Sequence, residues 1–134
     1  MSKTVTYPLE VFWEDTDAGG IVYHANYLKF MERARSKALA IAGIDQKALM
    51  NHELKFVVSQ MDIRFQKSAT LEDALIVETE LLERKRTFLV FDQRVLREGV
   101  LLCQARVTVA MVNNQGRPSA MPEALVNAIE ATFK

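Results

Sequence analysis

The chain has 134 residues, of which 49% are hydrophobic and 25% are charged, so it can bury the core of one domain and is too apolar to be a disordered segment. Lysine plus arginine and aspartate plus glutamate each number 17, and this balance gives no reason to expect binding to nucleic acid or to a membrane surface. The single cysteine excludes an intramolecular disulfide framework and suits a reducing compartment.

The start of the sequence has no apolar run of the kind found in signal peptides, and no stretch reaches the ~18 consecutive apolar residues of a membrane span. We therefore expect a cytoplasmic protein. No linker, repeat or low-complexity segment divides the chain, and the three prolines lie near its ends, at positions 8, 118 and 122. Residues 1–134 are accordingly predicted to form a single domain.

The first predicted elements are a strand and a long helix. Residues 5–13 are predicted to form a short strand that ends at an acidic loop. A helix is predicted over 26–42 because apolar residues recur there at steps of three and four, opposite a polar stripe. Asn26 is its predicted N-cap, and Gly43 is its predicted stop. The apolar positions are Tyr27, Met31, Ala34, Ala38 and Ile41, widened by Phe30 and Leu39.

The second half of the chain contains consecutive strand signals. Four strand-like runs follow the helix, near residues 55–65, 74–83, 87–97 and 101–112. Glu98 and Gly99 supply a tight turn between the last two runs, and residues 83–86 are short enough to be another hairpin connection. A closing helix is predicted over 122–133, with Pro122 at its favoured first position.

One long helix followed by antiparallel strands predicts an α+β fold in which a five-stranded sheet wraps the helix. A single helix cannot cover both faces and both edges of such a sheet, so pairing with a second copy is expected. Cys103 falls in the apolar phase of its strand and is predicted to be a core residue. His52 lies in a charged connection and is predicted to be exposed.

The candidate catalytic residues are concentrated in residues 14–27. This segment places carboxylates, two adjacent glycines and a histidine just before the long helix. A helix start offers unpaired N–H groups and a positive dipole end, which would stabilise a carbonyl oxygen gaining negative charge. Asp17 would act on the carbonyl carbon, as a nucleophile or as a base toward water. His24, seven residues later, can face the same pocket and orient water or substrate. The alternative for Asp17 is a solvated or capping carboxylate.

Other chemistries lack the necessary residues. Asp15, Asp17 and Gly20 match three positions of a calcium-binding EF-hand loop, but Gly19 and Asn26 stand where two further ligands are needed. One cysteine and two distant histidines are too few for zinc. The sequence also has no nucleophile elbow of the Gly-x-Ser-x-Gly type and no glycine-rich phosphate loop. No metal and no cofactor are predicted.

This small set of catalytic groups limits the classes of substrate that the protein could hydrolyse. A thiol has a pKa near ~8.5, so a thioester needs little acid assistance at its leaving group, whereas an amide would need much more. One carboxylate and a helix-end site are sufficient for thioester hydrolysis. The basic turn at residues 84–86 is by default a solvated hairpin tip, and its functional alternative is a contact with the phosphates of coenzyme A or of a carrier prosthetic group.

Residues 14–27, together with Phe30 and the segment 32–35, resemble the signature of hotdog-fold thioesterases. The similarity is greatest to the Tol-Pal-associated acyl-CoA thioesterase branch, near the 4-hydroxybenzoyl-CoA thioesterases, and it runs the whole length, including residues 68–73. The resemblance implies a long helix wrapped by an antiparallel sheet, dimerised through the sheet as a homodimer or assembled further as a homotetramer.

The resemblance also implies roles for particular residues. The active-site aspartate of the family falls on Asp17, and its adjoining polar position falls on His24. Backbone amides near Tyr23 and His24 would polarise the thioester carbonyl. The candidate oxyanion and substrate-binding residues are Gly20, Val22 and Tyr23. The candidate contacts to the coenzyme A phosphates are Lys85 and Arg86.

The substrate implied by the resemblance is an acyl-CoA, with acyl carrier protein as a further partner and a peripheral position at the bacterial inner membrane. Ser68 stands where many relatives have proline, at the rim of the pocket. Two alternatives remain open. One is an enoyl-thioester hydratase on the same fold, although the gap between Asp17 and His24 is longer than in the hydratase pattern. The other is a non-catalytic protein that binds acyl carrier protein or an envelope complex.

Overall fold

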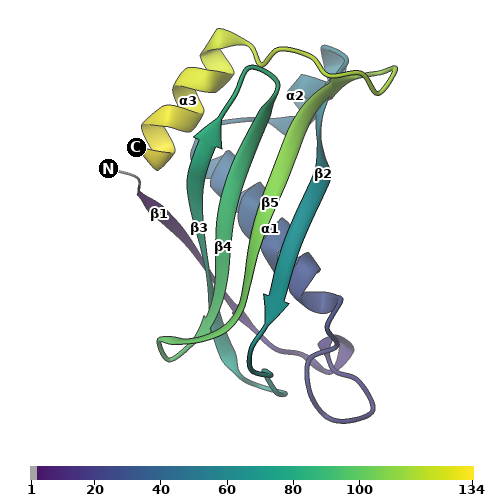
Figure 1. Ribbon diagram of the computed structural model, residues 1–134, viewed down its shortest axis with the longest axis vertical. Coiled ribbons are helices and arrows are strands. Elements are labelled where there is room, and N and C mark those ends of the chain that lie inside the picture. Colours follow the sequence, from purple (N-terminus) through teal and green to yellow (C-terminus); the bar gives the residue numbers. More distant parts are fainter. Residues whose placement is uncertain (1–2) are drawn as a thin grey trace.

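A five-stranded antiparallel sheet wraps one long helix in the computed structural model, which describes residues 3–134 (Figure 1). The strands are β1 (Thr4–Glu10), β2 (Leu54–Phe65), β3 (Ala74–Arg84), β4 (Phe88–Arg97) and β5 (Val100–Asn113). The helices are α1 (Asn26–Ile41), α2 (Gln46–Asn51) and α3 (Glu123–Phe133), with a 3₁₀ turn at Trp13–Asp15. The predicted α+β fold is confirmed. No helix within residues 3–134 is both long enough and apolar enough to cross a membrane.

The strands follow the order β1-β3-β4-β5-β2, and every pair is antiparallel. Both predicted hairpins are present, and the turn between β4 and β5 has positive φ at Glu98 and at Gly99, as two-residue hairpin turns require. A β-bulge where β5 pairs with β4 leaves Leu102 without a partner. Leu102 and Cys103 are both completely buried. The prediction of Cys103 as a core residue is confirmed, and burial raises the pKa of its thiol to about 12.

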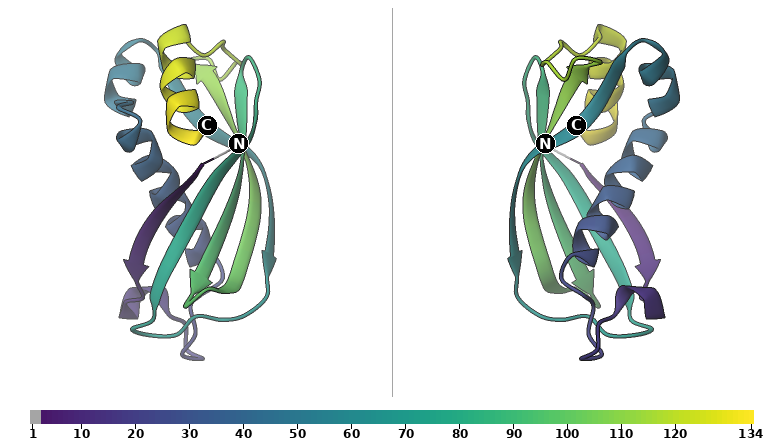
Figure 2. Two further views of the ribbon diagram at one scale, coloured as in Figure 1. Left: turned by 90° about the vertical axis from the view of Figure 1, so that its left-hand side faces the viewer. Right: turned by 90° about the vertical axis from the view of Figure 1, so that its right-hand side faces the viewer.

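The inner face of the sheet buries α1, and α3 covers the same face near one end (Figure 2). Phe30 and Met31 on α1 are completely buried, which confirms most of the predicted apolar stripe. The prediction is wrong for Ile41, whose side chain is 58% exposed. It is the last residue of α1, and Ile44 beyond the helix packs against the core. His52 is exposed, as predicted.

Several predicted element ends move, most of them by one residue, and three of the differences concern the first strand and the helix starts. β1 ends at Glu10 rather than at residue 13, because the Asp15 carboxylate accepts the N–H of Phe12 and the chain turns into the 3₁₀ segment. The N-cap position of α1 belongs to Ala25, and Asn26, the predicted cap, is the first helical residue. Pro122 precedes α3 as its N-cap residue instead of starting the helix.

The short helix α2 was not predicted. Its N-cap is Asp45, whose Oδ1 accepts the N–H groups of Lys47 at 2.9 Å and Ala48 at 3.3 Å. A capping aspartate was therefore present in the sequence. The helix has only six residues, and none of them is buried, so no apolar periodicity accompanies the cap.

A buried polar network joins α1 to the middle of the sheet. The Arg35 Nη1 donates to Gln93 Oε1 at 2.8 Å. Gln93 Nε2 in turn donates to the Met31 carbonyl at 3.0 Å and to Thr79 Oγ1 at 2.9 Å. Gln93 and Thr79 are completely buried, and Arg35 is nearly so. The network fixes α1 to β3 and β4 by directional bonds inside an otherwise apolar layer.

Replacing Gln93 by leucine should lower the free energy of unfolding by about 2–4 kcal/mol, because Arg35 and Thr79 lose a buried partner without regaining water. Urea denaturation measures the loss. The matched control is Gln104→Leu, on the next strand, where the side chain is only partly buried and bonds Asp92. That variant should lose less than about 1 kcal/mol, and equal losses in the two variants would contradict a structural role for the network.

Candidate active site

A hollow of about 190 Å³ lies at the start of α1, and both Asp17 and His24 line it. The remaining wall comes from Ile21 and Val22 of the same loop, from Tyr27 of α1, and from the segment 65–68 at the end of β2. Both side chains are exposed, so the two groups can meet a ligand that enters from solvent. The structure thus places the carboxylate and the imidazole around the same small volume.

The Asp17 carboxylate is held from one side by its own loop. Its Oδ1 accepts the N–H of Gly19 at 2.9 Å, and the Asp17 carbonyl accepts the N–H of Gly20 at 3.0 Å. Gly20 has φ +83°, which favours glycine. A Cβ at Gly19 would lie 3.2 Å from Asp17 Oδ1. The second carboxylate oxygen accepts no hydrogen bond from a described residue, so it is free to act on a ligand.

Asp15, two residues earlier, has a structural role. It is buried; its Oδ2 accepts the N–H of Phe12, and its Oδ1 accepts a hydrogen from Asn26 Nδ2, both at 2.9 Å. Its carbonyl accepts the N–H of Tyr23 at 2.9 Å. These three bonds join Asp15 to Phe12 at the end of β1, to Tyr23 before the helix and to Asn26, the first residue of α1. No cluster of three or more possible metal ligands is found within residues 3–134.

Three of the N–H groups predicted as oxyanion donors, those of Gly20, Val22 and Tyr23, are engaged within the chain. They donate to carbonyl oxygens at 2.9–3.0 Å in the pairs Gly20 to Asp17, Val22 to Ala69 and Tyr23 to Asp15. The first three N–H groups of α1 likewise donate to carbonyls three residues back. The N–H groups of His24 and Ala25, directly before the helix, donate to no described residue. The predicted His24 N–H is therefore a free donor at the positive end of α1, and the N–H of Ala25, which was not predicted, is a second.

Aromatic rings, rather than hydrogen bonds, hold the His24 side chain. Its ring centroid lies 4.6 Å from that of Tyr23 and 6.1 Å from that of Phe65. Phe65 also packs against Tyr27, whose hydroxyl accepts the N–H of Ala69 at 3.0 Å. Burial raises the pKa of Tyr27 in spite of that hydrogen bond, so the hydroxyl stays neutral.

The rim of the hollow is fixed by residues that the sequence analysis missed. Arg97 Nη1 donates to Asp73 Oδ2 at 2.7 Å and to the Ser68 carbonyl at 3.2 Å. Asp73 Oδ2 also accepts the N–H of Thr70 at 2.8 Å. Burial acts to raise the pKa of Asp73, but the hydrogen bonds from Thr70 and Arg97 outweigh it and hold that pKa below its usual value. Arg97 lies more than twenty residues from both partners, so no local pattern indicates the contact.

The basic turn lies far from Asp17 within one chain. Lys85 and Arg86 follow β3, whose first residue pairs with the last residue of β1 at the motif end of the sheet. Eleven residues of strand span roughly 35 Å, so the turn occupies the opposite end (Figure 1). The neighbouring Arg84 bonds Glu130 on α3 at 2.8 Å. Lys85 and Arg86 are exposed.

The tie between Asp15 and Asn26 can be tested by exchanging the two groups. Asn26→Asp places two carboxylates in contact in a buried position and should lower the free energy of unfolding by about 2–3 kcal/mol. In the double variant Asp15→Asn with Asn26→Asp, an amide again faces a carboxylate and most of that loss should be recovered. Urea denaturation measures the stability, and hydrogen exchange at the Tyr23 amide reports the loop. Additive losses would show that the two side chains do not interact.

Comparisons with known proteins identify the family of this chain. Residues 11–129 match the family model of the thioesterase-like superfamily. The chain is 42% identical over 122 residues to the acyl-CoA thioester hydrolase YbgC of Escherichia coli O6:H1, covering 90% of this chain and 91% of that protein. It is 42% identical over 120 residues to the acyl-CoA thioesterase YbgC of Haemophilus influenzae, covering 88% of each. The crystal structure of a probable thioesterase from Bartonella henselae superposes with a TM-score of 0.86 at 32% identity, covering 90% of this chain and 100% of that one. This protein belongs to the thioesterase-like superfamily.

Proposed function

We propose that this protein hydrolyses the thioester bond of an acyl-CoA, releasing a free acid and coenzyme A. The observation that carries the proposal is the hollow at the start of α1, which Asp17 lines together with His24, whose N–H group donates to no described residue. The activities named for the relatives from Escherichia coli and Haemophilus influenzae support the substrate class.

The reaction needs a group that attacks and a group that holds the oxyanion. The thioester carbonyl oxygen would accept hydrogen bonds from the N–H groups of His24 and Ala25, in the field of the helix dipole. Asp17 would act in one of two ways. It attacks the carbonyl carbon to form a mixed anhydride that water later opens, or it takes a proton from the water that attacks. In both cases the thiolate leaves and takes up a proton.

His24 would position the substrate or the attacking water. Its exposed ring contacts the rings of Tyr23 and Phe65 at the rim of the hollow. Phe65 and Tyr27 give the hollow an apolar wall beside the carboxylate. Such a wall suits the acyl carbons next to the thioester and limits the access of bulk water.

Asp17→Asn should reduce turnover by about 10²–10⁴-fold and leave the melting temperature close to that of the wild type, because the new amide oxygen can still accept the N–H of Gly19. Thiol release from short, long and aromatic acyl-CoA esters measures the rate and identifies the preferred acyl group. The matched control is Asp62→Asn, an exposed aspartate on the outer face of the sheet. Wild-type turnover in the Asp17 variant would refute the assigned role.

The same assay separates the alternatives. Crotonyl-CoA hydrolysis releases a thiol, whereas hydration removes the enoyl absorbance without thiol release. Hydration alone would establish the hydratase. No reaction with any ester would favour the binding protein, for which acyl carrier protein or an envelope complex is the expected partner.

We also propose that the working unit is a homodimer or homotetramer. Among the described residues, the outer edge of β2 pairs with no strand, and β2 is twelve residues long. Lys85 and Arg86 cannot reach the hollow of their own chain, so they would contact coenzyme A bound at a neighbouring copy. A cytoplasmic location stays the expectation that the sequence patterns gave. A peripheral place at the inner membrane, use of acyl carrier protein and the link to Tol-Pal rest on the family resemblance.

Replacing Lys85 and Arg86 together by glutamine should raise KM for an acyl-CoA roughly tenfold or more, because charge-assisted contacts to phosphate are lost. kcat should change little, since neither residue lies near Asp17. The corresponding acyl-pantetheine, which lacks the nucleotide phosphates, should show no difference between variant and wild type. Lys47→Gln with Arg117→Gln, two other exposed basic residues, is the control. An equal effect on both substrates would contradict phosphate recognition.

A further inference from the structure

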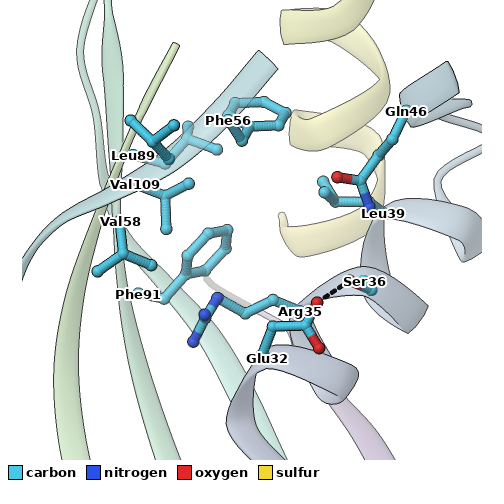
Figure 3. Close-up of a pocket in the computed structure, with 11 residues that line it drawn as sticks. Glu32, Arg35, Ser36, Leu39, Gln46, Phe56, Val58, Leu89, Phe91 and Val109 are labelled. Atoms are coloured by element: carbon cyan, nitrogen blue, oxygen red, sulfur yellow. Dashed lines mark hydrogen bonds between the residues drawn. The ribbon is translucent and has the colours of Figure 1, made fainter. Parts of the chain in front are cut away.

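A second hollow, of about 120 Å³, lies between α1, α2 and the inner face of the sheet (Figure 3). It shares no residue with the hollow around Asp17. Most of its wall is aliphatic or aromatic. The apolar residues include Leu39, Phe56, Val58, Leu89, Phe91 and Val109. We call it the Arg35 slot, after the one cation in its lining.

Arg35 is 9% exposed, and only one of its nitrogens is engaged within the chain, Nη1 with Gln93 Oε1. Nε and Nη2 donate to no described residue. No fully buried side-chain nitrogen or oxygen of residues 3–134 lacks a partner, so these two atoms reach open space. The Arg35 side chain extends into the slot beside Phe91 (Figure 3). Free N–H groups of a guanidinium therefore face an apolar cavity.

No carboxylate of the described residues lies within ion-pair distance of the Arg35 guanidinium. A buried cation is costly unless a negative group pairs with it, and Arg35 forms no ion pair with any described residue. Burial lowers the pKa of Arg35, and the charge of Glu32 acts in the opposite direction. The carboxylate of Glu32 also lines the slot, where it accepts the hydroxyl of Ser36 at 3.2 Å and forms no ion pair with Arg35.

We propose that the Arg35 slot binds a short aliphatic carboxylate, with the carboxylate on Arg35 and the chain along Phe91 and Val109. The two free N–H positions of a guanidinium match the two oxygens of a carboxylate, and the apolar wall matches an aliphatic chain. The site does not depend on the chemistry of Asp17. A free acid of this kind is also a product of the proposed hydrolysis, so any role in product retention rests on that function.

The test is a titration of the assembled wild-type protein with hexanoate, followed by NMR of valine and leucine methyl groups. Hexanoate should produce saturable shifts at Leu89 and Val109. Hexan-1-ol and hexylamine, which have the same chain with a neutral or a positive head group, should bind at least about tenfold more weakly. The Asp17→Asn variant should bind hexanoate as the wild type does, because the two hollows are separate.

Three variants change the slot in different ways. Arg35→Met should weaken hexanoate binding about ten- to hundredfold, while Arg33→Met, an exposed arginine of the same helix, should have no effect. Glu32→Gln should strengthen binding, since it removes a repelling charge. Val58→Trp should block the slot without touching Arg35. If Arg35→Met fails to fold, the Glu32 and Val58 variants still decide the question.

Several results would overturn the proposal. One is the absence of hexanoate binding to the wild type, in particular if Arg35→Met then changes the oligomeric state, which would show that a second copy fills the slot. Another is equal binding of hexan-1-ol and hexanoate, which would mean that the slot does not recognise the carboxylate. Methyl shifts confined to the surroundings of Tyr27 would place the bound acid in the other hollow.

Discussion

The burial of α1 against one face of a twisted sheet is the constraint from which the rest of the structure follows. Because the apolar side of the helix must lie along the inner face, its first turn comes to one end of the sheet. The loop before α1 and the segment after β2 meet at that end and enclose the hollow. Helix packing therefore brings a dipole end, two unpaired N–H groups and a carboxylate to the same end of the sheet. No additional helix or strand is needed to position these groups.

The two aspartates of the segment 14–27 have different roles: Asp15 stabilises the loop, and Asp17 is available to a ligand. Asp15 is buried and uses both carboxylate oxygens on the chain, so it holds the shape of the loop. Asp17 is exposed and keeps one oxygen free. Two residues of spacing and an intervening turn produce this difference, because the first carboxylate points toward the helix and the second toward the hollow. Rigidity and reactivity thus come from identical side chains in different surroundings.

Sequence patterns predicted the features that follow from periodicity and turn chemistry. The helix stripe, the two hairpins and the buried phase of Cys103 all follow from local spacing. Contacts between residues far apart in the sequence were not predicted, among them those of Arg97 with Asp73 and of Arg35 with Gln93. The residues next to an arginine in the sequence do not indicate which distant residue it will contact. The donors at Gly20, Val22 and Tyr23 show a third limit. A motif indicates which N–H groups lie near a site, but whether each is already bonded depends on the folded backbone.

The two adjacent glycines of the motif set different limits on sequence change. At Gly20 the surroundings are open, and only the left-handed backbone resists a larger residue. At Gly19 the backbone is ordinary, but a methyl group would press on the oxygen of Asp17. Substitution at the first glycine therefore acts on the position of the reactive group, and substitution at the second acts on loop folding. A library varied at these positions would separate loss of activity from loss of expression, although the residues are neighbours.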